Sequence, residues 1–194
     1  MYIFIVFYTI LYCVVYIPLF CIAALWNKKI REGLRGRISQ IWSIRTIVQA
    51  AQYKKVILIH SASVGEWEQS IPIIQQLKQS HSNLYIIATF FSPSGMRHAK
   101  KTDVDAALYL PFDIVVTAYF FLKKIRPAVW IISKYDVWPG FVCAAHMLRI
   151  PIVLCSAELA QDSTRHKGLN AYINRIFYSH IHTIFPVSEE YKQH

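Results

Sequence analysis

One acidic residue of this chain, Glu66, occupies a position where it could act as a general base. It ends the run HSASVGE at residues 60–66, which follows the apolar residues 56–59 and precedes a helical pattern. In open α/β sheets ligands bind in the crevice beyond the carboxyl ends of the strands, so a carboxylate in that loop can take a proton from a substrate. We therefore take Glu66 as the candidate catalytic residue.

The same spacing also has a structural explanation. Ser63 and Glu66 fit the S-x-x-E pattern of a capping box, in which both side chains accept hydrogen bonds from the first backbone N–H groups of a helix. As a cap the carboxylate points toward the Ser63 backbone, and as a base it points into the crevice. From spacing alone capping is the stronger interpretation. A helix amino terminus also favours the ionised carboxylate, which keeps Glu66 available as a base.

A second loop, FFSPSG at residues 90–95, offers hydroxyls and backbone amides at a helix start. This arrangement is typical of an anion site, although an ordinary turn and cap explains it equally well. We expect no metal site, because His180 and His182 have no nearby Cys, Asp or Glu partners. The four cysteines show no CxxC spacing and predict neither a zinc site nor a disulfide framework.

Short β-rich runs alternate with helical patterns along the rest of the chain, which predicts βαβ units. The fold class is therefore α/β, with a Rossmann-like parallel sheet flanked by helices over residues 56–194. Several strands are continuous apolar runs, as expected when helices cover both faces of the sheet. The expected strands are 56–60, 84–89, 106–110, 128–133, 151–155 and 182–187. The expected helices are 64–80, 95–101, 114–125, 139–148 and 168–179.

The first 26 residues are expected to form a membrane anchor helix. Residues 2–26 carry no charged side chain, and about 20 apolar residues suffice to cross a bilayer. The features of a cleaved signal peptide are absent, so we expect the segment to be retained. Whether it spans the membrane or lies in the interface stays open. The basic residues follow in an expected juxtamembrane linker, 27–55, and the positive-inside rule places the remainder in the cytoplasm.

The formal net charge of +10 points to a partner that carries phosphates. Nucleic acid is one such partner, but the basic residues gather beside the apolar segment, where each would gain about 1 kcal/mol from anionic headgroups. We therefore expect anionic membrane lipids, and no nucleic acid, as a partner. The expected membrane-surface residues are Lys28, Lys29, Arg31, Arg35 and Arg37.

Taken together, the loops resemble the amino-terminal half of the bacterial Kdo transferases, the 3-deoxy-D-manno-octulosonic-acid transferases of lipopolysaccharide assembly. The resemblance covers essentially the whole chain, and the order and spacing of its motifs make it specific. It rests on the apolar segment, the basic stretch 31–37, HSASVGE at 60–66, FFSPSG at 90–95, YLPFD at 109–113, VWP at 137–139, IPIVL at 150–154 and VSEE at 187–190.

The resemblance implies a GT-B glycosyltransferase, with two Rossmann-like domains facing a cleft, of which this chain is the acceptor-binding one. Glu66 would take the proton from a primary hydroxyl of the lipid A precursor, lipid IVA. That oxygen would attack the anomeric carbon of Kdo, and CMP would leave CMP-Kdo with inversion and without a metal or other cofactor. The implied location is the cytoplasmic side of the bacterial inner membrane. The candidate acceptor-binding residues are His60, Ser63, Gly65, Ser92, Ser94, Gly95 and Arg97.

The chain departs from the family pattern in two loops. Lys134-Tyr135-Asp136 stands where many members have E-T-E, and Glu158 replaces a common arginine. Nothing in the sequence supplies the donor domain, so we expect this fragment to be inactive alone, as a truncated, split or incompletely read gene product. A catalytically inactive, membrane-tethered module that binds phosphorylated lipid is an alternative. A GT-B transferase acting on another lipid-linked sugar is a further one.

Overall fold

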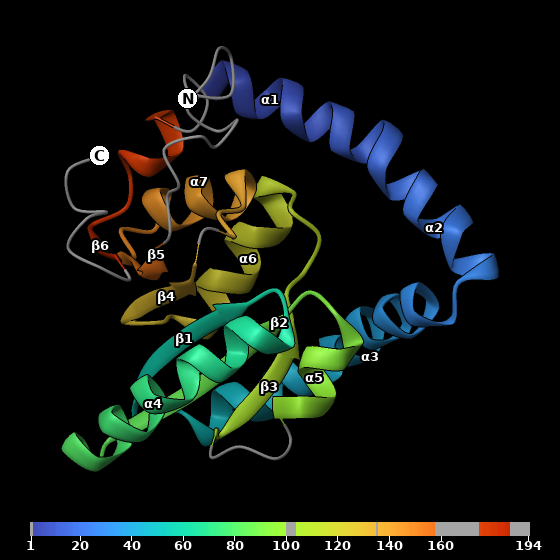
Figure 1. Ribbon diagram of the computed structural model, residues 1–194. Coiled ribbons are helices and arrows are strands. Elements are labelled where there is room, and N and C mark those ends of the chain that lie inside the picture. Colours follow the sequence, from blue (N-terminus) through green and yellow to red (C-terminus); the bar gives the residue numbers. More distant parts are fainter. Residues whose placement is uncertain (1, 100–103, 135, 158–174, 187–194) are drawn as a thin grey trace.

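The computed structural model describes residues 2–99, 104–134, 136–157 and 175–186. Its centre is one parallel sheet of six strands in the order β3-β2-β1-β4-β5-β6 (Figure 1). The strands are β1 (Lys55–Ser61), β2 (Leu84–Phe90), β3 (Ala106–Tyr109), β4 (Val129–Ser133), β5 (Ile152–Ala157) and β6 (Thr183–Pro186). The predicted Rossmann-like fold is confirmed, although most of the helix expected at 168–179 lies outside the described residues.

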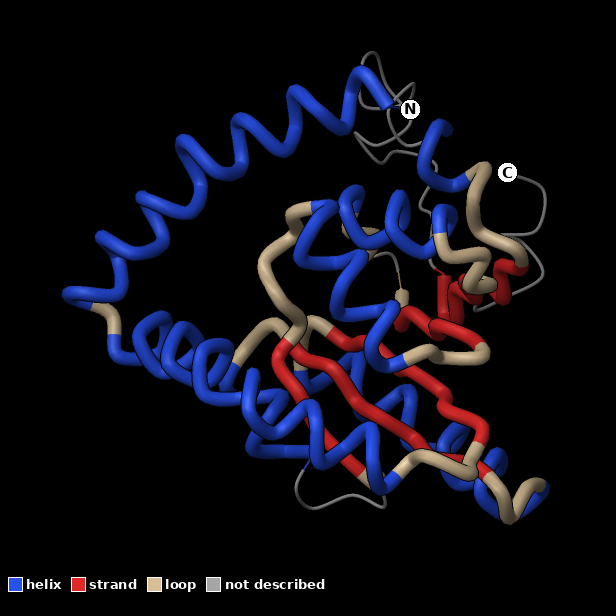
Figure 2. The backbone as a smooth tube through the Cα atoms, turned by 180° about the vertical axis from the view of Figure 1, so that it is seen from behind, coloured by secondary structure: helices blue, strands red, loops and turns tan. Residues whose placement is uncertain are grey.

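Helices cover both faces of the sheet (Figures 1 and 2). Successive side chains of a strand point to opposite faces, so Ile57 and Ile59 of β1 pack with Trp67 on one side, and Leu58 packs with Trp130 on the other. Both groups are almost fully buried, as the continuous apolar runs predicted. The first face carries α4 (Val64–Ser80) and α5 (Pro93–Ala99), and the second α6 (Val115–Ile125) and α7 (Pro139–Met147).

The basic stretch expected to be a linker folds as a long helix, α3 (Lys28–Ala50). The side chain of Asn27 begins it by accepting hydrogen bonds from the main-chain N–H groups of Lys29 and Ile30, at 3.0 and 3.3 Å. The helix lies along β3, where a Cβ added to Gly36 would be 2.1 Å from Tyr109 Cε2. The stretch is therefore packed against the sheet.

The apolar segment forms one long helix with a change of winding in its middle. It consists of α1 (Tyr2–Leu11), a π-helical turn η1 (Tyr12–Tyr16) and α2 (Ile17–Trp26). Residues Phe4–Trp26 are long and apolar enough to cross a membrane, with a mean hydropathy of 2.4. In the structure this helix arches along one side of the domain, from the α7 end to the start of α3 (Figures 1 and 2).

An aromatic residue stands at every fourth position of this helix: Phe4, Tyr8, Tyr12, Tyr16 and Phe20. Positions four apart drift by about 40° per step in an α-helix, and the slower winding of the π-helical turn offsets that drift. The rings of Tyr12 and Tyr16 stack at 4.5 Å, and Phe20 contacts Phe112 at 5.3 Å. We call these five residues the aromatic stripe. The opposite side of the helix is aliphatic and exposed.

Candidate active site

Loops from three strands meet at the carboxyl edge of the sheet, as predicted. Phe91, after β2, stacks on Trp138, after β4, with ring centroids 5.1 Å apart. The guanidinium of Arg37 lies 4.5 Å from the centroid of the Phe91 ring and 5.3 Å from that of Phe112, after β3. The aromatic stripe joins them, because Phe20 contacts both phenylalanines. This edge is thus an aromatic platform around a buried cation.

Glu66 lies in the first turn of α4 and completes the capping box. Its Oε2 accepts hydrogen bonds from the main-chain N–H groups of Ala62 at 2.7 Å and Ser63 at 3.4 Å, and Ser63 Oγ accepts one from the Glu66 N–H at 3.3 Å. The capping interpretation is confirmed. The half-buried carboxylate still has a second oxygen, Oε1, which has no hydrogen-bond partner among the described residues. One oxygen can therefore hold the helix start while the other faces a substrate.

Three buried serine hydroxyls, which are hydrogen-bonded to one another, hold the first turns of α4 in place. Ser61 of β1 lies 3.3 Å from Ser70 of α4 and 3.2 Å from Ser133 of β4, oxygen to oxygen, and Ser70 and Ser133 are also hydrogen-bonded to each other. Ser70 Oγ donates to the main-chain oxygen of Glu66 at 3.2 Å. These serines hold the carboxylate-bearing turn against two strands. Neither Ser70 nor Ser133 was among the candidate site residues predicted from the sequence.

His60 is fully buried, and both ring nitrogens have partners. Nδ1 lies 3.1 Å from both the carbonyl oxygen and the hydroxyl oxygen of Thr89. Nε2 lies 2.9 Å from Asp136 Oδ2, and that oxygen also accepts from Trp138 Nε1 at 2.8 Å. His60 ties β1 to β2 and to the loop after β4, and its direct contact with an acceptor stays a prediction.

The serine loop after β2 behaves as a turn and cap. Ser92 Oγ accepts from the Gly95 N–H at 3.3 Å and lies 3.0 Å from Ser94 Oγ. A Cβ on Gly95 would lie 2.5 Å from Phe90 Cδ1, so packing explains this glycine. At Gly65, by contrast, an added Cβ would meet nothing within 4 Å. The packing of this chain therefore does not require a glycine at position 65, beside Glu66.

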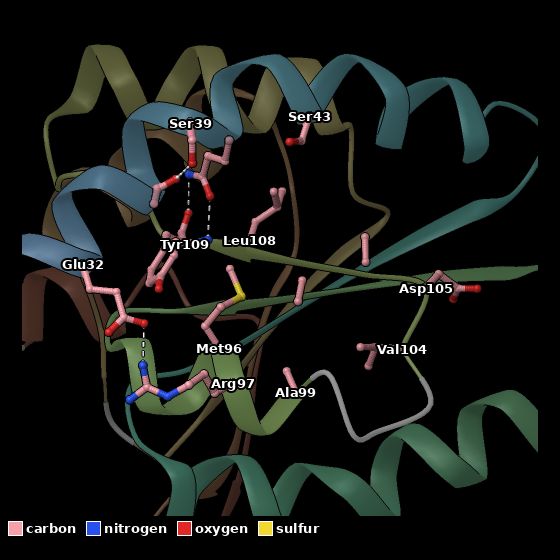
Figure 3. A pocket seen from close by; sticks show the side chains of 14 residues that line it. Glu32, Ser39, Ser43, Met96, Arg97, Ala99, Val104, Asp105, Leu108 and Tyr109 are labelled. Carbon is pink, nitrogen blue, oxygen red and sulfur yellow. Dashed lines mark hydrogen bonds and ion pairs between the residues drawn. The ribbon is translucent and has the colours of Figure 1, made fainter. Parts of the chain in front are cut away.

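Arg97 lines a cavity of about 510 Å³ at the open edge of β3, between α3 and α5 (Figure 3). Its guanidinium pairs with Glu32, and both side chains are partly exposed. Beside this pair, Gln40 donates to the Tyr109 carbonyl at 2.8 Å and accepts from the Tyr109 N–H at 2.6 Å. The Gln40 side chain thus makes the two hydrogen bonds that a neighbouring strand would otherwise make with the main chain of Tyr109. Arg97 belongs to this edge of the sheet, two strands away from β1.

Asp113, the last residue of the YLPFD motif, is a buried carboxylate. Its oxygens accept from the N–H groups of Gly140 at 3.1 Å and Phe141 at 2.9 Å, and from Tyr8 Oη at 2.7 Å. Burial raises its pKa to about 6, while these hydrogen bonds oppose the rise. A Cβ on Gly140 would lie 2.7 Å from Asp113 Oδ1, so this glycine permits the close approach of α7.

The expectation that Arg37 faces the membrane surface is wrong, since its side chain is buried among the loops at the sheet edge. It points inward because its helix position falls on the packed side of α3 with Gly33 and Gln40. Lys28, Lys29 and Arg35 are exposed, and half-buried Arg31 donates to the carbonyl groups of Ala24 and Leu25 at the end of α2. Within the described ranges no three His, Cys, Asp or Glu side chains group as metal ligands.

Comparison with protein families decides the relationship of the chain. The family described as 3-deoxy-D-manno-octulosonic-acid transferase (kdotransferase) matches residues 34–194. This range includes Glu66 and the loops that follow β1, β2, β3 and β4. The chain belongs to the Kdo transferase family.

Curated Kdo transferases show the same relationship. The chain is 32% identical to that of Haemophilus influenzae over 114 residues, which are 58% of this chain and 27% of the relative. It is 24% identical to that of Chlamydia muridarum over 164 residues, 81% of this chain and 38% of the relative. The chain therefore spans between a quarter and two fifths of these Kdo transferases.

Solved structures support the fold alone. The Listeria monocytogenes protein described as a putative UDP-N-acetylglucosamine 2-epimerase matches with a TM-score of 0.55 at 9% identity, over 72% of this chain and 40% of that one. A second UDP-N-acetylglucosamine 2-epimerase matches with a TM-score of 0.54 at 14% identity, over 72% and 44% of the two chains. The domain thus has the GT-B-like architecture expected of a Kdo transferase.

One departure from the Kdo transferase pattern now has a structural context. Asp136, the acid of the Lys134-Tyr135-Asp136 loop, is held by His60 and Trp138. Lys134 adopts a positive φ of 61°, and its N–H donates to the Cys155 carbonyl at 2.7 Å. Asp136, which is shorter than the glutamate of many family members, is therefore held in a defined position at the edge of the sheet. Tyr135, Glu158 and the closing motif 187–190 lie outside the described residues.

Proposed function

We propose that this chain is the acceptor-side half of an inverting, metal-independent transferase that moves Kdo from CMP-Kdo to lipid IVA. CMP-Kdo would bind a second, carboxyl-terminal domain of the kind that the longer relatives have room for. The protein would act at the cytoplasmic side of the inner membrane. Membership of the Kdo transferase family supports the reaction, and the position of Glu66 supports the mechanism.

In this mechanism Glu66 is the general base. An alcohol is a weak nucleophile until its proton leaves, and a positioned base contributes roughly 10² to 10⁴ in rate. Oε2 of Glu66 holds the cap, and Oε1, which has no hydrogen-bond partner among the described residues, would accept the proton of a substrate hydroxyl. The hydroxyl oxygen attacks the anomeric carbon of Kdo, its proton passes to Glu66, and the bond to CMP breaks on the opposite face.

The position of the apolar helix supports a lipid acceptor. The aromatic stripe borders the carboxyl edge of the sheet, and the outer side of the helix is aliphatic and exposed. A lipid whose acyl chains stay among such side chains would bring its sugar headgroup to the same edge as Glu66. Two of the candidate contacts, Ser63 and Ser92, lie in the loops after β1 and β2. The other two, Gly65 and Ser94, lie in the first turns of the helices that follow, α4 and α5.

The test is Glu66→Gln in the full-length protein, assayed for Kdo transfer from CMP-Kdo to lipid IVA. Glutamine can fill the same capping position, so we expect folding to be retained and transfer to fall by roughly 10² to 10⁴. Glu68→Gln is the matched control, because it makes the same change at an exposed glutamate two residues further along α4. Normal turnover in Glu66→Gln would sink the assignment.

The second candidate function is an inactive module that binds phosphorylated lipid. The capping role of Glu66 favours it, because a purely structural role explains the hydrogen bonds of Oε2. This candidate predicts that the wild-type full-length protein binds lipid IVA but transfers no Kdo. It also predicts that Glu66→Gln leaves lipid binding unchanged.

A further inference from the structure

Two histidines that are far apart in the chain lie side by side at the end of α7. His146 is in the last turn of α7, and His180 follows a helical turn at residues 175–178. Their imidazole rings are perpendicular, with an angle of 89° between the planes, and their centroids are 4.5 Å apart. The sequence places only His182 near His180, whereas the fold adds the ring of His146.

Both rings have a nitrogen that is available to a ligand. Nδ1 of His180 lies 2.8 Å from the main-chain oxygen of Ile176 and 3.2 Å from Ser179 Oγ, and Nε2 has no hydrogen-bond partner in the described part of the chain. Neither nitrogen of His146 has one there, and this side chain is exposed. A histidine that binds a metal ion commonly has its other ring nitrogen held by a main-chain carbonyl, as His180 has.

The spacing of the two rings fits two imidazoles on one metal ion. A metal–nitrogen bond is about 2.0 to 2.1 Å long, so two rings bound at right angles to each other have centroids about 4.5 Å apart. Right angles between ligands are typical of Cu²⁺ and Ni²⁺, and imidazole is a good ligand for both ions. The tetrahedral geometry that Zn²⁺ prefers would hold the rings further apart.

The backbone holds both histidines in place at the edge of the sheet opposite Glu66. The N–H of His180 donates to the Phe177 carbonyl at 3.1 Å, and Phe177 is almost fully buried. The carbonyl of His146 accepts from the Arg149 N–H at 3.1 Å. In a parallel sheet each helix returns the chain to the amino ends of the strands, so the end of α7 and the start of β6 lie at that edge. The histidine pair is therefore separate from the proposed reaction.

We propose that His146 and His180 bind a divalent transition-metal ion that favours right-angled ligands, Ni²⁺ or Cu²⁺. Water would fill the remaining coordination positions. The ion would tie the end of α7 to the residues before β6, which is the edge strand beside β5 and is mostly exposed. Metal binding would thus stabilise this edge of the domain. This inference does not depend on the proposed Kdo transfer, which uses no metal.

The test is calorimetric titration of the full chain with Ni²⁺, together with thermal unfolding in the presence and absence of the ion. We expect saturable binding by the wild type and a higher melting temperature with Ni²⁺. His146→Phe keeps a ring beside His180 and removes both nitrogens, so it should weaken Ni²⁺ binding at least about tenfold. Its melting temperature without metal should match that of the wild type. His81→Phe is the matched control at an exposed histidine that follows α4.

The second probe is Mg²⁺, which requires oxygen ligands and should not bind. Ni²⁺ binding that His146→Phe loses and His81→Phe keeps supports the site. Equal Ni²⁺ binding by His146→Phe and the wild type, or no saturable binding by the wild type, overturns it. An equal response to Mg²⁺ and Ni²⁺ also overturns it, because the ligands would then not be imidazoles.

Discussion

Tyr8 Oη donates a hydrogen bond of 2.7 Å to Asp113 Oδ2, and the two residues are 105 positions apart in the chain. Tyr8 belongs to the apolar helix, while Asp113 follows β3 and also caps the start of α7. A single carboxylate therefore joins the helix to the domain. Together with the aromatic stripe, this bond holds the helix along the domain.

The first prediction concerns pH. The folded protein holds the Asp113 proton up to about pH 6, whereas an unperturbed aspartate releases it near 3.8. The folded state thus binds more protons between these values, and the contribution of Asp113 to the free energy of unfolding falls as the pH rises through this window. We expect the stability of the wild type relative to Asp113→Asn to decrease from about pH 4 to about pH 6 and then to level off.

Urea unfolding of both proteins between pH 4 and 7, followed by tryptophan fluorescence, measures this difference. Asparagine cannot ionise, so subtracting its curve isolates the titration of residue 113. A relative stability that rises with pH in this window would show that the folded pKa lies below its ordinary value, contrary to the effect of burial described above.

The second prediction compares Gly36, which is tightly packed, with Gly65, where a side chain would have space. Gly36→Ala should destabilise the protein by about 1 to 3 kcal/mol, because its Cβ would lie 2.1 Å from the Tyr109 ring on a packed helix. Gly65→Ala should stabilise it by about 0.5 kcal/mol, because the Cβ meets nothing and alanine restricts the unfolded chain. If an acceptor approaches this turn, Gly65→Ala raises the KM for lipid IVA. An unchanged KM would remove Gly65 from the acceptor site.

The third prediction concerns the outer side of α3. Ile38 and Trp42 are 59% and 84% exposed, and exposed Arg35 and Arg45 share their side of the helix. Apolar side chains beside arginines are typical of a helix face that lies on anionic lipid. We expect Trp42→Ala to lower partitioning into phosphatidylglycerol vesicles about tenfold, in line with the burial of one large side chain.

Sedimentation with vesicles of increasing phosphatidylglycerol content measures this partitioning. Phe185→Ala is the matched control, because Phe185 is 56% exposed on β6, at the opposite edge of the sheet from α3. Equal partitioning of the two variants would show that α3 does not contact the lipid.

Local sequence patterns were sufficient to predict the parallel sheet and the start of α4. Ile57 and Ile86 lie in continuous apolar runs that only a covered sheet accommodates, and Ser63 and Glu66 form a cap from residues three apart. These features depend on spacing within one element, so the chain encodes them locally. The family relationship was also legible, because it rests on the order of short motifs.

Only the tertiary structure decided which of the polar residues are buried and what they hold. Arg37 appeared as one of several basic residues and became a buried cation, because α3 packs that side against β3 and the loops beyond it. Asp113, Asp136 and Tyr12 acquired their surroundings from partners far along the chain. Glu66 was ambiguous in the sequence, since the direction of each carboxylate oxygen depends on how α4 meets β1. Contacts between distant elements are fixed by packing, and a single sequence does not record them.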